Sequence, residues 1–509
     1  MRPHPDLSGT APKPTWLPIA LGSLLRLVQI WMPVVGVHSW RQADTAAMAR
    51  HFSQAGTPIW LPQIDWGGAS AGFVESEFPL YPFLVSRLYS LIGVEEWLGR
   101  GLSVLCSALT IWLMMRLGRR WFSPEAGWWA GMAFAIAPLG VYYGRAFQAE
   151  ALLVLCAAGA LEAHSIWVER RKAWAVSLSW ICFSTAALIK VIPLLWLGLP
   201  LLLVQLTPSP LAKAESPQQI LQRLLRLTLN PWFWVYASTA LAVTSAWYLH
   251  AYQLGEASGL TFGFWGEDSD RSNIGLALNL SSWVNLAIRT GLRALVVAGV
   301  PLIVIGTMRS WRRGGGRIAL GGVIGMLICT VATMKSSTVH EYYQLPFLLF
   351  SSPLVGLGWQ TWKYKQRRWL IQILLSITFI ASLSMLSIDY WAVEMRHRSI
   401  WMPLAENIRK ELPANARVVS VTDSDPTLLN LARRQGWIIP SRELNLEKLK
   451  KLKDDGASHI TGSLSWHNTY TPMQEDESKR IRQIMLTNST SFSGTDRKTY
   501  LIPMKDLIP

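Results

Sequence analysis

The stretch Gly101-Leu-Ser-Val-Leu-Cys-Ser-Ala-Leu-Thr-Ile-Trp-Leu-Met-Met-Arg-Leu-Gly-Arg-Arg120 decides the fold of this chain. Its apolar part, 101–117, is long enough to cross a lipid bilayer as a helix, and a basic cluster follows at once. Further basic clusters recur after every second apolar stretch, at 170–172, 223–226, 309–317 and 363–368. The loops between these clusters are poor in basic residues. This alternation is typical of a membrane protein with many spans, whose basic loops face the cytoplasm.

The composition agrees with this interpretation. Of the 509 residues, 50% are hydrophobic and 16% are charged, which is too apolar for an ordinary soluble protein of this length. Much of the net charge of +16 lies in short loops beside apolar runs, so topology and attraction to anionic lipid explain it better than nucleic-acid binding does. We therefore expect membrane lipids, and no nucleic acid, among the partners.

The apolar runs predict about eleven membrane crossings. They lie at 16–36, 101–117, 124–143, 148–168, 174–190, 191–206, 232–251, 294–309, 318–334, 344–361 and 369–388. The run 79–93 is apolar too, but it is short and contains proline. Counting it as a span would invert every later basic cluster, so we predict an interfacial or re-entrant helix there.

The charge rule also predicts the orientation of the chain. We expect 1–15 to be a cytoplasmic tail and 16–389 to be the transmembrane catalytic domain of a multi-pass inner-membrane or plasma-membrane protein. Residues 37–100 form its first extracytoplasmic loop, with juxtamembrane helices. Residues 144–148, the turn at Lys190, 252–293 and 335–343 face outward as well. The unusual polar residues of the chain then collect on this outer face.

The tail 390–509 differs in kind, because it is polar and charged. A strand-like run begins at Arg417, a helical pattern covers 426–434, and a Gly-Trp-Ile-Ile turn leads into another strand. A charged helix around 447–455 and a short strand near His459 follow. Strands that alternate with helices predict a small α/β domain, which we place outside the cytoplasm as an accessory domain.

The first outer loop carries the main polar constellation, His38-Ser-Trp-Arg-Gln-Ala-Asp44-Thr-Ala-Ala-Met-Ala-Arg50. Its alanines favour a helix, on which Arg41 and Asp44 are three residues apart and close enough to pair. The alternative is an interfacial helix whose ion pair is merely solvated. The loop continues to Glu77, just before Pro79, while Asp65 and Glu75 look like solvated loop acids.

These residues resemble the GT-C superfamily of membrane glycosyltransferases, in particular the family 39 group of protein O-mannosyltransferases and lipid A aminoarabinose transferases. Four segments carry the resemblance, which covers roughly 30–390. They are Arg41-Gln-Ala-Asp44, Glu77-Phe-Pro79-Leu, Gly144-Arg145-Ala-Phe-Gln-Ala-Glu150 and His340-Glu341-Tyr342-Tyr343-Gln-Leu-Pro346. The resemblance implies a GT-C fold and transfer of a sugar from a polyprenyl-phosphate donor on the outer face.

The resemblance also implies that an acid of the first loop acts as the catalytic base, with inversion at the sugar. Asp44 is our first candidate and Glu77 our second. The common Glu-Lys-Pro of the family is Glu77-Phe78-Pro79 here, and the third-loop acid is Glu150, or is absent if Gln148 is the matching position. The acceptor can be a lipid, a glycan or a protein, and a divalent metal is possible.

A polyprenyl phosphate needs cations at the membrane surface to hold its charge as it leaves. The outward-facing candidates for this phosphate-binding role are Arg145, Lys190, Arg289, Arg293 and Lys335, of which Arg145 is our first and Arg293 our next candidate. Further substrate or phosphate contacts are Arg41, Glu150, His340, Tyr342 and Tyr343. For the arginines the alternative is snorkelling to lipid headgroups, and for the tyrosines an aromatic belt.

Two other classes of function compete with a glycosyltransferase. A transporter or flippase for a lipid-linked glycan would also span the membrane many times, but it would place ionisable residues at mid-membrane, where Arg26 is almost the only charge. A membrane phosphoryl or acyl transferase would demand a nucleotide or thioester donor.

Overall fold

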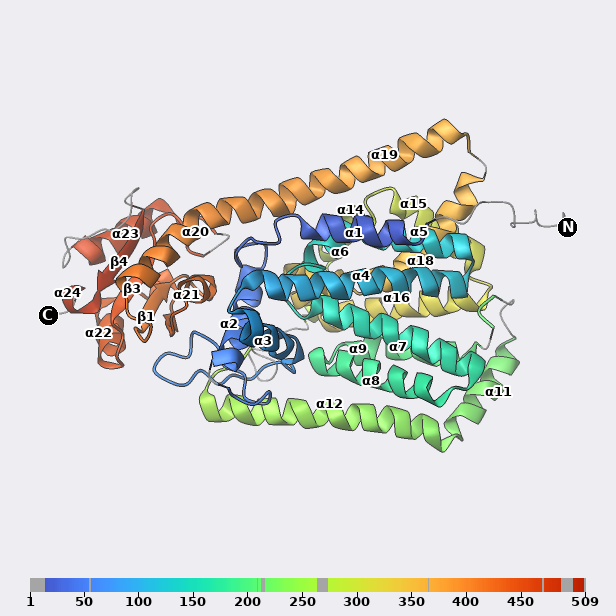
Figure 1. Cartoon of the computed structure of the whole chain (residues 1–509), viewed down its shortest axis with the longest axis horizontal. Coiled ribbons are helices and arrows are strands. Elements are labelled where there is room, and N and C mark those ends of the chain that lie inside the picture. Colours follow the sequence, from blue (N-terminus) through green and yellow to red (C-terminus); the bar gives the residue numbers. More distant parts are fainter. Residues whose placement is uncertain are drawn as a thin grey trace.

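The computed structural model describes residues 14–54, 56–207, 209–211, 216–262, 273–364, 366–468, 471–486 and 498–507. Most of the expected cytoplasmic tail 1–15, and part of the expected outer segment 252–293, therefore lie outside the described residues. A bundle of long helices forms one part of the molecule, and a small sheet with its helices lies at one end of it (Figure 1).

Each expected span coincides with a helix or with two helices in succession. These are α1 (Trp16–Leu27), α4 (Glu96–Trp121), α5 (Pro124–Ile136) with α6 (Pro138–Tyr143), α7 (Glu150–Arg170), α8 (Ala173–Ile189), α9 (Pro193–Trp196) with α10 (Gly198–Leu206), α12 (Pro231–Ser258), α15 (Gly299–Ser310), α16 (Gly314–Ala332), α18 (Phe347–Lys363) and α19 (Arg368–Met385). Among the described residues, four helices are long and apolar enough to cross a membrane by length and composition alone, namely α4, α7, α16 and the helix from Arg368 to Glu411. Most of the others are shorter, so the number of crossings stays a prediction.

Arg26 explains how a charge is tolerated deep in the bundle. Its guanidinium donates to the carbonyl oxygens of Gly22, Ala135 and Gly140 at 2.9, 3.1 and 2.8 Å. Two of these carbonyls flank the break between α5 and α6, where Pro138 interrupts the helical hydrogen bonds. Arg26 also donates to the carbonyl of Phe134 at 3.4 Å, which cannot accept a helical hydrogen bond from Pro138. Arg26 therefore supplies a donor where the break removes one.

The ends of the helices that carry basic clusters lie together. Arg116 and Arg120 of α4 pair with Glu162 of α7, and Lys363 of α18 pairs with Glu125 of α5. α11 (Pro217–Thr228) lies at this same end of the bundle in Figure 1, opposite the sheet. The segregation of charge expected from the sequence is thus present in three dimensions.

The first outer loop lies at the other end. It contains α2 (Ser39–Gln54) and α3 (Leu80–Ile92), and the aromatic rings of Phe52 and Phe83 pack edge to face between them at 5.6 Å. The short apolar run 79–93 thus forms a short helix against α2. Two further helices of this end, α14 (Leu280–Arg293) and α17 (Met334–Val339), precede the one-turn helix η3 (Glu341–Gln344).

The expected strands of the tail form a four-stranded sheet in the order β2-β1-β3-β4. The strands are β1 (Val418–Val421), β2 (Gly436–Ile438), β3 (His459–Ser463) and β4 (Thr499–Pro503), and the helices are α21 (Thr427–Ala432), α22 (Leu446–Asp454), α23 (Glu475–Leu486) and α24 (Met504–Leu507). β1 pairs in parallel with β2 and β3, while β4 is antiparallel to β3. The sequence patterns did not predict β4 or α23.

One continuous helix joins the bundle to the sheet. α19 passes through a π-helical turn, η4 (Leu386–Trp391), into α20 (Ala392–Glu411), which packs on α21 (Figure 1). The boundary that we expected at 389/390 falls inside this helix. Helices kink at π-turns and at proline, and this helix has a π-turn in η4 and Pro403 in α20. The place of the sheet beside the outer loop is therefore set by contacts, such as those of α20 and α2 with α21.

Candidate active site

α2 positions the two residues at the centre of the predicted site. The alanines of the segment favour a helix, and their small side chains let α2 pack closely against its neighbours. Asp44 is buried and accepts a 2.9 Å hydrogen bond from the indole Nε1 of Trp66. Arg41 pairs with Glu77. The expected pair between Arg41 and Asp44 is therefore wrong, because Glu77 from the end of the loop reaches Arg41 instead.

Asp65 and Glu75 are not the solvated acids that the sequence suggested. Both are buried, and Asp65 pairs with Arg50 at 2.5 Å and with His51 at 2.9 Å. The carboxylate of Glu75 accepts a hydrogen bond from Thr261. These partners come from α2 and from the segment after α12, which folds back over the loop. The two acids therefore hold the loop together.

The pKa values of the two buried aspartates, Asp44 and Asp65, shift in opposite directions. Desolvation raises the pKa of Asp44 to about 7, against the hydrogen bond from Trp66 and the charge of Arg41. Burial also acts on Asp65, but the adjacent Arg50 and His51 outweigh it and hold its pKa below the ordinary value. Asp44 is thus a carboxylate that can gain and lose a proton near neutral pH.

The segment between α6 and α7 brings the next candidates together. Tyr143 donates a 2.9 Å hydrogen bond to Glu341, and Glu150, the first residue of α7, pairs with Lys190 at 2.6 Å. The ammonium of Lys190 also lies 4.6 Å from the ring centre of Tyr342 and 5.0 Å from that of Tyr343. Four of the predicted site residues thus share one cluster, namely Glu150, Lys190, Tyr342 and Tyr343.

Arg289 and Arg293 extend this cluster from one face of α14. Arg293 pairs with Glu341 and lies 3.2 Å from Asp389 of η4. Arg289 donates to Gln344 at 3.0 Å and to the backbone carbonyls of residues 337 and 338. The hydrogen-bond partners that the structure describes for Arg289 are all neutral, so its positive charge is not balanced by direct contact with an acid.

His340 lies among aromatic rings. Its imidazole stacks on Tyr342 with ring centres 5.3 Å apart, and His38 lies at the same distance edge to face. Burial, together with nearby cations, lowers the pKa of His340 to about 3, so the ring is neutral at physiological pH. It can offer a hydrogen bond to a sugar or a phosphate without adding charge.

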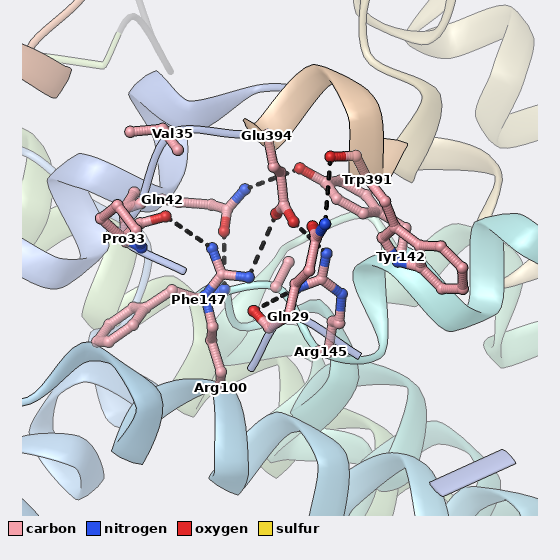
Figure 2. A network of polar contacts seen from close by, with 12 residues as sticks. Gln29, Pro33, Val35, Gln42, Arg100, Tyr142, Arg145, Phe147, Trp391 and Glu394 are labelled. Carbon is pink, nitrogen blue, oxygen red and sulfur yellow. Dashed lines mark hydrogen bonds and ion pairs between the residues drawn. The ribbon is translucent and has the colours of Figure 1, made fainter. Parts of the chain in front are cut away.

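Arg145 is placed differently from the other candidates. It is fully buried, pairs with Glu394 of α20, and lies with Arg100 on either side of that carboxylate (Figure 2). Arg100 also donates to the carbonyl of Pro33 at 3.1 Å, just before α2. Glu394 could not be recognised from the sequence, since it lies far along the chain in a segment that we assigned to an accessory domain.

The C-terminal domain contacts the outer loop through β2 and contacts α2 through α21. The backbone N–H of Gly436 donates to the carbonyl of Asp65 at 2.8 Å, and the N–H of Gly68 donates back to Gly436 at 2.8 Å. Thr427 of α21 donates to Ser39, the first residue of α2, at 3.0 Å. The edge strand β2 therefore pairs with the loop segment that carries Trp66, the hydrogen-bond partner of Asp44.

A pocket opens to solvent beside these groups. Arg41 and Thr45 of α2 line it, together with Glu77, Gln148 and Glu150. Two lining acids are paired with cations, Glu77 with Arg41 and Glu150 with Lys190. In the described part of the chain, no three or more His, Cys, Asp or Glu side chains are grouped to hold a metal ion.

Part of the chain matches a known protein family, and nearly all of it matches a solved structure. A family model described as dolichyl-phosphate-mannose-protein mannosyltransferase matches residues 76–250, less than half of the chain. No curated protein sequence matches significantly. Among solved structures, ArnT from Cupriavidus metallidurans, bound to undecaprenyl phosphate, is similar with a TM-score of 0.66 at 14% identity, over 97% of this chain and 98% of that one.

Two further structures share the architecture more distantly. The archaeal oligosaccharyltransferase AglB from Archaeoglobus fulgidus, in complex with an inhibitory peptide and a dolichol-phosphate, has a TM-score of 0.54 at 12% identity, over 89% of this chain and 69% of AglB. The arabinofuranosyltransferase AftD from Mycobacteria has a TM-score of 0.50 at 15% identity, over 90% of this chain and 37% of AftD. The chain thus has the GT-C fold, and the fold that the resemblance in its sequence implied is confirmed.

Proposed function

We propose that this protein transfers a sugar from a polyprenyl-phosphate donor to a hydroxyl acceptor at the extracytoplasmic face of the membrane. The observation that carries the proposal is the position of Asp44. It is a buried carboxylate with a pKa of about 7, held by Trp66 and one helical turn from Arg41, at one end of a GT-C bundle. The undecaprenyl phosphate bound to ArnT, which shares this fold, supports a lipid-phosphate donor.

Asp44 acts as the general base. It takes the proton of the acceptor hydroxyl as that oxygen attacks the anomeric carbon from the face opposite the phosphate. The bond between the anomeric carbon and the phosphate oxygen breaks, and its electrons leave with the polyprenyl phosphate. One substitution of this kind inverts the configuration of the sugar. Because the phosphate is stable without a proton, no second carboxyl group is needed as an acid.

The carboxylate of Glu77 is the second candidate for the base. It lines the pocket, which favours it, but it is paired with Arg41 and must leave that partner to accept a proton. Among the described residues, Asp44 has no cation in direct contact, and its hydrogen-bond donor is the neutral indole of Trp66. A carboxylate held by a neutral donor in a buried site is the better base, so we retain Asp44 as the first candidate.

The donor phosphate binds among Lys190, Arg289 and Arg293. Three positive groups beside the tyrosines of η3 can hold a phosphodiester and stabilise the negative charge that grows as it leaves. Lys190 and Arg293 are also paired with acids, but these acids, Glu150 and Glu341, belong to the same cluster. Arg145 does not join these cations, because it is fully buried against Glu394 of α20, which also pairs with Arg100. No step of this proposal uses a metal.

Reconstitution of the purified protein in liposomes tests the proposal. The vesicles would contain undecaprenyl-phosphate and dolichyl-phosphate monosaccharides as donors. In a separate measurement, mass spectrometry of the lipids of a deletion strain would show which donor accumulates. We expect release of the free lipid phosphate and transfer of the sugar. Movement of the intact lipid between leaflets without release of the sugar would overturn the proposal and favour a flippase.

A further inference from the structure

Gln148 has a side chain without an internal partner. It is 1% exposed, and neither its amide nitrogen nor its amide oxygen makes a hydrogen bond within the described residues. Leaving a buried donor or acceptor unpaired costs roughly 1–3 kcal/mol, so native proteins rarely keep one without a reason. Gln148 keeps two such atoms at the same position.

The reason lies in the pocket that Gln148 lines. The pocket is open to solvent on one side, so a ligand can reach Gln148 from outside the protein. Its charged side chains are occupied with other protein groups, since Arg41 pairs with Glu77 and Glu150 pairs with Lys190. Thr45 donates its hydroxyl proton to the carbonyl of Arg41 at 2.8 Å. Gln148 is therefore the lining residue whose hydrogen-bonding groups most clearly need a ligand.

The chemistry of the free groups identifies the kind of ligand. A primary amide that offers one donor and one acceptor matches two neighbouring hydroxyl groups, one of which accepts while the other donates. A phosphate would be drawn instead to Lys190 and the arginines of α14. The apolar side chains of Met48, Phe78 and Ile189 also line the pocket and suit the C–H faces of a sugar ring.

We propose that Gln148 reads the hydroxyl pattern of the transferred sugar and so determines which sugar the enzyme accepts. This inference rests on the proposed function, and it deepens it by placing the sugar between α2 and the start of α7. A site whose buried polar groups are completed by a substrate discriminates strongly against analogues that lack the matching hydroxyl, since those groups then stay unpaired.

Binding measurements distinguish recognition of the sugar from recognition of the phosphate. The probes are undecaprenyl phosphate alone and its glucose, mannose, galactose and arabinose phosphodiesters, offered to the full-length protein in nanodiscs. Gln148→Met keeps the length of the side chain but cannot make these hydrogen bonds. We expect it to lose about tenfold or more in affinity for the preferred sugar-lipid, with unchanged affinity for undecaprenyl phosphate. Gln54→Met, at an exposed glutamine of the same region, is the matched control.

Deoxy analogues of the preferred sugar-lipid provide a comparison within each protein, which does not depend on how well the Gln148→Met variant folds. The wild-type protein should lose affinity when one particular hydroxyl is removed, and Gln148→Met should be indifferent to that removal. If both proteins respond equally to every deoxy analogue, the role of Gln148 is overturned while the proposed transfer stands. If the wild-type protein binds undecaprenyl phosphate but none of its sugar derivatives, the proposed function fails as well.

Discussion

The indole of Trp66 donates a 2.9 Å hydrogen bond to Asp44, from a loop segment that is itself paired with Gly436 of the small sheet. The proposed base is therefore held by three parts of the chain, namely α2, the outer loop and the edge of the sheet. This arrangement gives the C-terminal sheet a part in the site. The hydrogen bond from Trp66 orients the carboxylate of Asp44. Because no cation contacts this carboxylate among the described residues, the carboxylate remains basic.

The first prediction concerns this carboxylate. Asp44→Asn keeps the size of the side chain and the oxygen that accepts from Trp66, but it cannot take a proton. General-base participation is worth about 100- to 10,000-fold, so sugar transfer should fall by at least the lower figure. The measurement is the rate of transfer by protein in liposomes, with donor binding measured alongside.

The matched variant is Glu77→Gln, which removes the partner of Arg41. We expect this variant to raise the dissociation constant for the substrate by a larger factor than it lowers the rate of sugar transfer from the bound substrate. Near-normal transfer by Asp44→Asn, together with collapse in Glu77→Gln, would contradict our assignment and move the role of base to Glu77.

The second prediction concerns pH. Burial raises the pKa of Asp44 to about 7, so the protonated, inactive form predominates below that pH. The rate of transfer should therefore fall as the pH drops below about 7, by about tenfold for each unit, and level off above it. A pH profile of kcat at saturating donor checks this. The residual activity of Asp44→Asn should lack this acidic limb, and an identical limb in that variant would assign it to another group.

Local pattern predicted the bundle well, because a helix and its length in the membrane are decided by neighbouring residues. The run 101–117 and its arginines suffice for α4, and the short run 79–93 forms the short helix α3. Pairing between distant residues was not predictable in this way. The partner of Arg145 lies 249 residues further along the chain, so its role as a buried structural group could not be seen from its own motif.

The same limit applies to the acids of the first loop. Asp65 resembles a solvated acid because its sequence neighbours are polar, yet Arg50 and His51 from α2 bury it. The contact of β2 with this loop depends on how the sheet is carried by α20, which no periodicity in the sequence reveals. Candidate residues could therefore be named from the sequence, but their partners required the fold.

The third prediction separates the arginines. Arg289 contacts neutral oxygens, so its charge is available to a ligand, whereas that of Arg145 is committed to Glu394. Arg289→Ala should weaken binding of undecaprenyl phosphate by about tenfold or more, and Arg289→Lys should restore only part of it, since lysine lacks the forked geometry. Isothermal titration in nanodiscs measures this. Equal affinity in the wild-type and Arg289→Ala proteins would remove Arg289 from the phosphate site.

The fourth prediction concerns topology. The basic helix ends lie together at one end of the bundle and the sheet lies at the other (Figure 1). By the charge rule the basic end faces the cytoplasm. An alkaline phosphatase fusion after residue 413 should be active, and one after Arg171 should be inactive; green fluorescent protein at the same two sites should give the opposite result. A fluorescent fusion at residue 413 would contradict an external sheet.

The last prediction concerns Glu394, whose carboxylate balances both Arg100 and Arg145 (Figure 2). Glu394→Gln would leave two buried arginines without a counter-charge, and breaking a buried ion pair costs about 3–5 kcal/mol. Arg145→Met should cost less, since Arg100 still pairs with Glu394. In detergent, the unfolding temperature of Glu394→Gln should therefore be lower than that of Arg145→Met. Both temperatures should be lower than that of Glu406→Gln, which changes an exposed acid on the same helix.

α20 also holds the segment before α2, because His397 lies 3.0 Å from the carbonyl of Val35. Proteolysis near residue 66 should therefore become faster in Glu394→Gln. Equal unfolding temperatures for Glu394→Gln and Glu406→Gln would show that the pair does not stabilise the junction between bundle and sheet.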